Sequence, residues 1–181
     1  MDEGVPLVFD LPPALRGQGF ALRPETDADL PFLMELFAST RREEFAALGL
    51  PALQLEALLR GQFDAQRRHY RGRFPHCRFD VLTARGKPIG RLYLDPREKE
   101  VCIVDISLLP ARRGRGLGSA ILRALKDHAG AAGGGVSLMV AKPNPAFRLY
   151  RREGFSPVAD HGLYVEMDWR PAAAGRLQKV S

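Results

Sequence analysis

The residues with the clearest capacity for chemistry lie in a basic, glycine-rich segment with the sequence Arg112-Arg113-Gly114-Arg115-Gly116-Leu117-Gly118. It follows an apolar, β-branched run over 101–109 that predicts a strand buried on both faces, and it precedes apolar residues at helical spacing over 117–128. A glycine turn between a strand and a helix can point several backbone N–H groups at one anion, and the helix dipole adds to the attraction. The segment therefore predicts a phosphate-binding loop, with a solvated arginine-rich turn as the alternative.

Two common nucleotide-binding loops do not fit the spacing of these glycines. A P-loop requires four residues between its glycines and then Gly-Lys-Ser/Thr, a pattern that the sequence lacks. A dinucleotide-binding loop requires G-x-G-x-x-G, and Gly114 and Gly116 begin that pattern, but Ser119 stands where the last glycine belongs. Binding of a nicotinamide dinucleotide is therefore disfavoured.

The segment resembles the R/Q-x-x-G-x-G/A loop of the GNAT family of N-acetyltransferases, which binds the pyrophosphate of acetyl-CoA. The matching positions are Arg113, Gly116 and Gly118. A second similarity lies further along the chain, where 144–155 looks like the family pattern N-x-x-A-x-x-x-Y-x-x-x-G-F. The spacing between the asparagine and the alanine departs from the pattern, because Ala146 follows Asn144 by two positions rather than three. Counted from Ala146, the remaining positions match, namely Leu149, Tyr150, Gly154 and Phe155.

This resemblance implies both a fold and an activity. The fold is a single α/β (α+β) domain with a mixed, mostly antiparallel sheet, splayed where 101–109 meets 136–140 and flanked by about four helices. The activity is transfer of an acetyl group from acetyl-CoA, through a ternary complex and without a metal, to a primary amine of a small molecule or of a protein N-terminus or lysine. The cofactor contacts that the resemblance implies are Leu108, Leu109, Arg113, Gly114, Arg115, Gly116, Leu117, Gly118, Ser119, Asn144, Phe147 and Tyr150.

Acetyl transfer to an amine needs a stabilised oxyanion and a proton for the leaving thiolate. The resemblance places the oxyanion donor on the backbone near Leu108 and Leu109, and it makes Tyr150 the general acid. The alternative for Tyr150 is a core tyrosine with a bonded hydroxyl. Asn144 has an alternative too, because it stands where a helix N-cap would precede Pro145.

The reaction also needs a neutral amine, and two carboxylates are candidate bases. Asp105 interrupts an apolar strand, so it is expected to border the central cleft, unless it is a structural carboxylate that holds Arg91 or a backbone amide. Glu166 is the rival, because alternation in the final strand places it with Tyr164 and Asp168 on the face opposite the apolar residues. His69, His76 and His161 are expected to be surface or loop residues rather than bases.

Apolar periodicity supplies the elements that would position these residues. A capping-box pattern at Thr26 predicts a helix that continues through Phe37. Other helices are predicted over 51–70, 117–128 and 145–152. Strands are predicted over 20–23, 77–81, 88–94, 101–109, 136–140, 155–158 and 163–169.

Length and composition support one globular domain. The chain has 181 residues, of which 45% are apolar and 27% are charged. We expect an N-terminal extension over 1–18, the acetyltransferase domain over 19–170 and a flexible tail over 171–181. The longest stretch without Asp, Glu, Lys or Arg has 14 residues, which is too short for a membrane span, and a cytoplasmic location is expected.

Charge leaves other functions open. The net charge is +6, and 22 of the 27 basic residues are arginines dispersed along the chain. A nucleic-acid-binding module is therefore a less favoured alternative, and a CoA-binding regulator without turnover is another. A homodimer is also possible.

Overall fold

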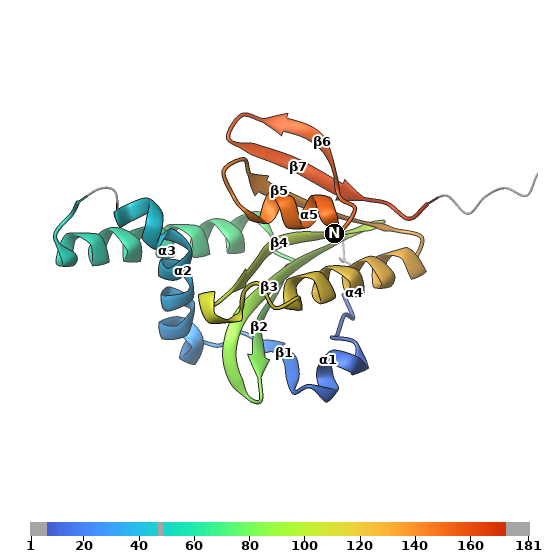
Figure 1. Ribbon diagram of the computed structural model, residues 1–181, viewed down its shortest axis with the longest axis horizontal. Coiled ribbons are helices and arrows are strands. Elements are labelled where there is room, and N and C mark those ends of the chain that lie inside the picture. The colour runs from blue at the N-terminus through green and yellow to red at the C-terminus, as the bar shows by residue number, and fades with distance from the viewer. Residues whose placement is uncertain (1–6, 47–48, 173–181) are drawn as a thin grey trace, which may run out of the picture.

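The computed structural model describes residues 7–46 and 49–172, and a seven-stranded sheet forms its centre (Figure 1). The strands are β1 (Phe20–Pro24), β2 (Arg78–Ala84), β3 (Lys87–Arg97), β4 (Glu100–Leu108), β5 (Gly135–Ala141), β6 (Ser156–His161) and β7 (Tyr164–Trp169). Their order is β1-β2-β3-β4-β5-β7-β6, and every neighbouring pair is antiparallel except β4 with β5. The sheet is therefore mixed and mostly antiparallel.

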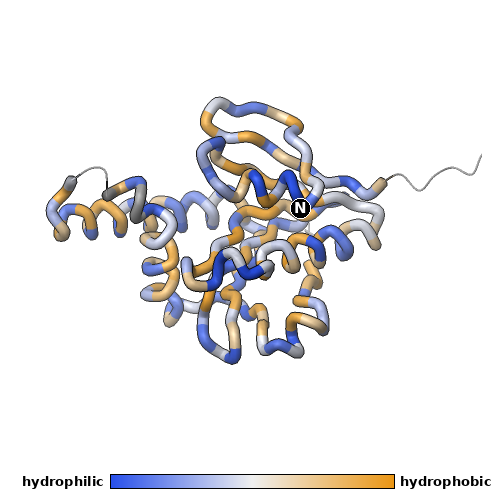
Figure 2. Tube along the Cα trace, in the orientation of Figure 1, coloured by the Kyte–Doolittle hydropathy of each residue, from blue (hydrophilic) through white to orange (hydrophobic). Residues whose placement is uncertain are grey.

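Helices cover both faces of this sheet. They are α1 (Pro13–Gly17), α2 (Leu30–Ala46), α3 (Ala52–Arg73), α4 (Leu117–Ala131) and α5 (Ala146–Arg152), with 3-10 turns at Asp27–Asp29 and Pro110–Arg112. The larger apolar core joins the sheet to α1, α4 and α5, and a smaller one joins it to α2 and α3. The neighbours Val81 and Leu82 on β2 belong to different cores, which shows that the two cores lie on opposite faces. Figure 2 shows the hydrophobic residues concentrated at this centre.

Local sequence explains where several elements begin and turn. The carboxylate of Asp29 accepts a hydrogen bond from the backbone N–H of Thr26 at 2.9 Å, which is the predicted capping box at the entry to α2. The β2–β3 turn places Arg85 at φ 49° and Gly86 at φ 77°, the left-handed pair that a tight hairpin requires. The capping box directs α2 onto one face of the sheet, and the turn brings β3 beside β2.

The predicted fold class is confirmed, and the differences are at element ends. α2 continues to Ala46 rather than ending near Phe37, and α1 was not predicted, because five residues between prolines and a glycine show no periodicity. The structure therefore has five α-helices in the described residues. Within the predicted N-terminal extension, Phe9, Leu11 and Leu15 are buried in the larger core.

The strand expected to be buried on both faces is buried only in its first half. Val101 to Ile103 are buried, whereas 104–109 are half-buried, because β4 separates from β5 there. The predicted tail lies outside the described residues from position 173 onward. None of the helices within the described ranges is long and apolar enough to cross a membrane.

Candidate active site

The parallel strands β4 and β5 pair over only part of their length. Pairing ends at Ile103 opposite Leu138, although β4 continues to Leu108 and β5 to Ala141. The separation begins at an irregularity in the β3–β4 ladder, where Val104 is skipped. We call the two segments that do not pair with each other, 104–108 of β4 and 139–141 of β5, the strand divergence. Their facing backbone groups are available to an extended ligand, and the splay is where the sequence analysis expected it.

The two faces of the strand divergence are chemically different. On β4, Ile106 and Leu108 pack against the larger core, on the face covered by α4 and α5. Asp105 and Ser107 alternate with them and face α3 instead. One side of the strand divergence therefore has the glycine-rich loop and the other has a polar cluster.

The glycine-rich loop ends at the first residue of α4. Gly114 and Gly116 have φ angles of 70° and 80°, a backbone conformation that side chains with a Cβ rarely adopt. The first helical hydrogen bond runs from the N–H of Ala120 to the carbonyl of Gly116 at 2.9 Å, so the N–H groups of 117–119 precede it. No acidic residue lies in the first turn of α4, and no side chain caps it. This helix end can therefore attract an anion.

Arg113 is held against the strand, while the neighbouring arginines are not. Its Nε donates to the carbonyl of Leu108 at 2.8 Å, and a second nitrogen donates to Ser39 on α2 at 3.4 Å. Arg112 and Arg115 form no ion pair with any residue that the structure describes, and both are exposed. Their charges are thus free to act on a ligand.

The two predicted oxyanion donors differ in their backbone surroundings. The N–H of Leu109 already donates to the carbonyl of Ile89 at 2.9 Å. Because hydrogen-bonded and non-bonded pairs alternate along an antiparallel ladder, the N–H of Leu108 points away from β3 and toward the strand divergence. Gly90 lies opposite Leu108, and a side chain there would collide with the carbonyl oxygen of Ser107. Of the two amides, that of Leu108 is the one directed toward the strand divergence.

Tyr150 is buried in α5, and its ring packs edge-on against Phe155 at a centroid distance of 5.9 Å. Its hydroxyl has no hydrogen-bond partner among the described residues, and it is not one of the fully buried polar atoms without a partner, so solvent or a ligand can reach it. Burial, followed by the charge of Asp105, raises the pKa of the phenol above its usual value. The hydroxyl therefore stays protonated and is free to donate.

Three other predicted cofactor residues have structural partners. Asn144 accepts a hydrogen bond from the N–H of Ala146 at 2.9 Å, as expected for a residue that precedes a helix. Phe147 packs against the larger core. Despite burial, the hydrogen bonds of Arg123 at 3.0 and 3.2 Å, followed by the Ser119 hydroxyl, hold the pKa of Glu153 below its usual value. The backbone N–H of Ser119 lies in the first turn of α4.

Asp105 is a member of a buried polar cluster on the α3 face. One oxygen accepts from Arg91 at 2.7 Å and from the Tyr70 hydroxyl at 3.2 Å, and the other accepts from Ser107 at 2.6 Å. Arg91 is 3% exposed and also donates to Gln66. Burial opposes its charge, but Asp105 raises the pKa of Arg91 above its usual value. The pairing with Arg91 is the structural alternative that the sequence analysis left open for Asp105.

Sequence reasoning did not assign Tyr70 and Ser107 to the site. Tyr70 and Gln66 stand four residues apart on the inward face of α3, and Ser107 lies directly opposite Arg91 in the β3–β4 ladder. The helical spacing was visible in the sequence. The strand register that aligns Ser107 with Arg91 was not.

Glu166 lies apart from this cluster, on β7. It is opposite Met139 of β5, and its side chain is 38% exposed. Its carboxylate is 3.4 Å from Nε2 of His161. Within the described part of the chain it forms no hydrogen bond with Asp105. Because the strand order is β4-β5-β7, the two predicted bases lie on opposite sides of the strand divergence.

Solved structures with the same fold include several acetyltransferases. An N-acetyltransferase, PaiA, of Thermoplasma acidophilum in complex with coenzyme A aligns with a TM-score of 0.63 at 18% identity, over 84% of this chain and 99% of that one. An acetyltransferase of Thermus thermophilus aligns at 0.59 and 25% identity, over 84% and 97%. RimL, an α-N-protein acetyltransferase of ribosomal L7/L12 in complex with coenzyme A, aligns at 0.57 and 17% identity, over 90% and 98%.

The sequence itself also matches a known family. Among curated proteins, no chain matches significantly. Residues 32–155 match the sequence profile of the acetyltransferase (GNAT) family, and this span includes the strand divergence, the glycine-rich loop and Tyr150. The chain therefore belongs to the GNAT family of acetyltransferases.

Proposed function

We propose that the protein is an N-acetyltransferase that moves an acetyl group from acetyl-CoA to a primary amine while both substrates are bound. The observation that supports this most directly is the strand divergence, which has an anion-binding loop on one face and a polar cluster on the other. A long phosphorylated thioester and an amine could approach the strand divergence from opposite faces of the sheet. Direct transfer requires that the thioester carbon and the amine nitrogen be held next to each other.

The residues on the α4 face fit the chemical parts of acetyl-CoA. The N–H groups of Leu117, Gly118 and Ser119 would hold the pyrophosphate, because they precede the first bonded N–H of α4. The backbone of Leu108 would bind the extended arm and donate to the oxyanion. Acetyl-CoA, when bound, supplies the activated acyl group.

Tyr150 is proposed to protonate the leaving thiolate. Its hydroxyl has no partner among the residues with described positions, and its raised pKa keeps the proton in place. A phenol near a developing thiolate can both donate a hydrogen bond and transfer the proton.

Glu166 is proposed as the base that receives the proton of the acceptor ammonium. Three donors already bond to Asp105, including a buried arginine, so its lone pairs are engaged. Glu166 is half-buried and has a single hydrogen-bond or ion-pair partner, His161, among the described residues. Asp105 is then a positioning residue that orders Tyr70 and Ser107 beside the strand divergence.

A direct assay tests this function. Purified protein is incubated with acetyl-CoA and a panel of small amines, amino acids and peptides with free N-termini, and thiol release is followed. We expect turnover with at least one class of amine, and mass spectrometry should find the acetyl group on nitrogen. Binding of acetyl-CoA without turnover across the panel would favour a regulator, and absence of binding would reject the proposal.

A further inference from the structure

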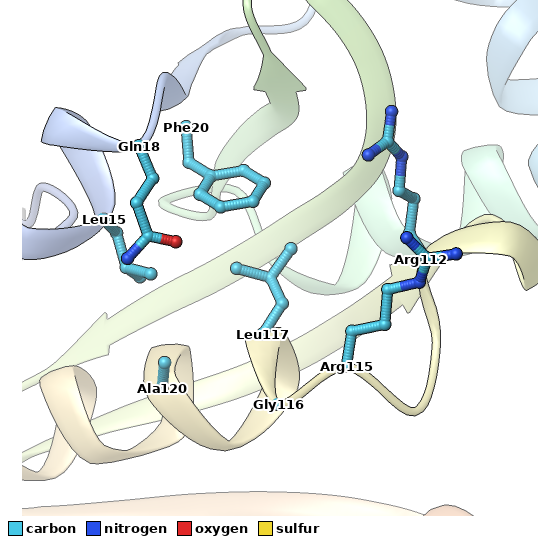
Figure 3. Close-up of a pocket in the computed structure, with 8 residues that line it drawn as sticks. All are labelled: Leu15, Gln18, Phe20, Arg112, Arg115, Gly116, Leu117 and Ala120. Carbon is cyan, nitrogen blue, oxygen red and sulfur yellow. The ribbon is translucent and has the colours of Figure 1, made fainter.

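The polar cluster around Asp105 lies on the α3 face of the strand divergence, apart from the loop that is proposed to hold acetyl-CoA. The glycine-rich loop, and a cavity of about 410 Å³ beside it that Leu15 and Phe20 help to line, belong to the α4 side instead (Figure 3). Tyr70 and Ser107 are half-buried, and the side chain of Asp105 is 11% exposed. The cluster is therefore within reach of the second substrate, the acceptor amine.

The two hydroxyl groups of this cluster have their hydrogens fixed in direction. The Tyr70 hydroxyl donates to one oxygen of Asp105 at 3.2 Å, and the Ser107 hydroxyl donates to the other at 2.6 Å. A hydroxyl has one hydrogen and two acceptor lone pairs, and an ionised carboxylate can only accept. Asp105 therefore cannot return a hydrogen to either group. Both hydroxyl oxygens present lone pairs, and no hydrogen, to a ligand.

Arg91 keeps Asp105 in this accepting state. Its guanidinium is 3% exposed, donates to Asp105 at 2.7 Å and donates to Gln66 at 2.8 Å. Protonation of Asp105 would leave this buried arginine without its counter-ion, which is costly. Burial, followed by the charge of Asp105, raises the pKa of Tyr70 above its usual value, so the phenol keeps its proton as well. The cluster has no net charge, so the direction of its hydrogen bonds decides which ligand fits.

The free lone pairs define the complementary ligand. Within the described part of the chain, no residue donates a hydrogen bond to the Tyr70 or Ser107 hydroxyl oxygen. Because both groups are bonded to one carboxylate, the two accepting oxygens are neighbours. A nitrogen with two N–H groups can satisfy both at once. A primary amine has two such groups, whereas an N-methylated amine has one.

We propose that the hydroxyl oxygens of Tyr70 and Ser107 bind the nitrogen of the acceptor amine and select primary amines. We call this pair of oxygens the nitrogen site. The inference rests on the proposed function, since it takes the strand divergence as the place of acetyl transfer. Two N–H groups donate to the nitrogen site, and the third position of the nitrogen faces the strand divergence. In the ammonium this position has the proton that Glu166 receives, and in the neutral amine it has the lone pair that attacks the thioester carbon.

A secondary amine fits this arrangement poorly. Its additional carbon would lie against one of the two oxygens and leave the lone pairs of that oxygen without a donor. A site that is built to accept an N–H group from its substrate discriminates strongly against an analogue that lacks the group. The selection therefore depends on two named oxygens and can be measured.

Paired amines test this proposal on the full chain. For the best amine of the assay panel and for its N-methyl derivative, kcat/KM is measured at saturating acetyl-CoA. The two amines have similar basicity, so the ratio of their kcat/KM values reports on the site. Wild-type protein should prefer the primary amine by about a hundredfold or more.

Variants then assign the preference to the two oxygens. Tyr70→Phe and Ser107→Ala each remove one acceptor and keep most of the packing, so each should lower the ratio about tenfold or more, with little change in the KM for acetyl-CoA. Ser107→Thr keeps an accepting hydroxyl and should keep the wild-type ratio. Ser137→Ala is the matched control, because Ser137 is on the same face of the sheet but donates to Glu100 at 2.9 Å, in the part of β5 that pairs with β4.

The outcomes separate this inference from the proposed function. Turnover with equal kcat/KM for the two amines in the wild-type protein would overturn the nitrogen site and leave acetyl transfer intact. An unchanged ratio in both Tyr70→Phe and Ser107→Ala, or an equal fall in Ser137→Ala, would also overturn it. Absence of turnover with every amine of the panel would reject the proposed function, and the nitrogen site with it.

Discussion

At the residue scale, Tyr150 is the side chain whose packing and chemistry are easiest to separate. Its ring contacts Phe155, while its hydroxyl has no partner within the described residues. Tyr150→Phe keeps the ring and removes only the proton donor. We expect the acetylation rate to fall about 10²- to 10⁴-fold where chemistry is rate-limiting, with little change in melting temperature or CoA affinity. A Phe variant with the wild-type rate would show that Tyr150 is only a packing residue.

The second prediction at this scale concerns Asp105 and Glu166. Asp105→Asn leaves the buried Arg91 without its charged partner, and we expect a loss of about 3 kcal/mol in the free energy of unfolding, measured by denaturant titration. Glu166→Gln should change stability by less than about 0.5 kcal/mol, because the residue is 38% exposed, and should lower turnover more strongly.

The pH profile distinguishes the two roles. If Glu166 is the base, turnover of Glu166→Gln should depend less on pH than turnover of the wild-type protein does. A stable Asp105→Asn protein with a flattened pH profile would instead make Asp105 the base.

At the element scale, the glycine-rich loop depends on left-handed backbone at Gly116. Gly116→Val forces a β-branched residue into φ 80°, so the loop should shift and acetyl-CoA binding should be lost in calorimetry. Gly133→Val is a matched control, because Gly133 has φ 69° just after the other end of α4 and an added Cβ would meet no atom within 4 Å at either position. Both variants should lose similar stability. Normal CoA binding by Gly116→Val would remove the loop from the site.

The entry to α2 gives a prediction about pH and stability. Two hydrogen bonds from Arg23, at 2.6 and 2.7 Å, and one from the N–H of Thr26 hold the pKa of Asp29 well below its usual value. A carboxylate with a lowered pKa stabilises the fold above its unfolded pKa of about 3.9, and this contribution is lost as the pH falls. Asp29→Asn should therefore cost about 1 to 2 kcal/mol at pH 7, and this cost should decrease progressively as the pH falls from about 4 toward the lowered pKa of Asp29. A cost that stays constant over this range in urea titrations would contradict this.

At the scale of the whole molecule, cofactor binding should stabilise the fold. A ligand that binds only the folded state adds about 2.7 kcal/mol at a hundredfold excess over its Kd, which is about 5 to 10 °C in melting temperature for a chain of this size. Acetyl-CoA and CoA should produce such a rise, whereas NAD and ATP should produce a smaller one. An equal rise with ATP would indicate a general response to phosphates.

Much of this molecule could be predicted from the sequence because its signals are local. The order of strands and helices follows from apolar periodicity, the β2–β3 turn from Arg85-Gly86, and the loop from the glycines before α4. The helix α1 is an exception. Its five residues are too few for a period, and its place in the core depends on contacts with distant residues such as Leu82.

By itself, the sequence determined the order of the elements and the positions of the loop and Tyr150, because each depends on residues close together in the chain. The fold class and the strand divergence were expected from the resemblance of these segments to the GNAT family. Only the tertiary structure decided what those residues contact. Asp105 is paired with Arg91 because the β3–β4 register, which includes a skipped residue, brings them to one face. Likewise, the cavity lined by Leu15, Phe20 and Leu117 forms because the chain returns α1 to the side of α4, a contact between segments about 100 residues apart that local pattern does not encode.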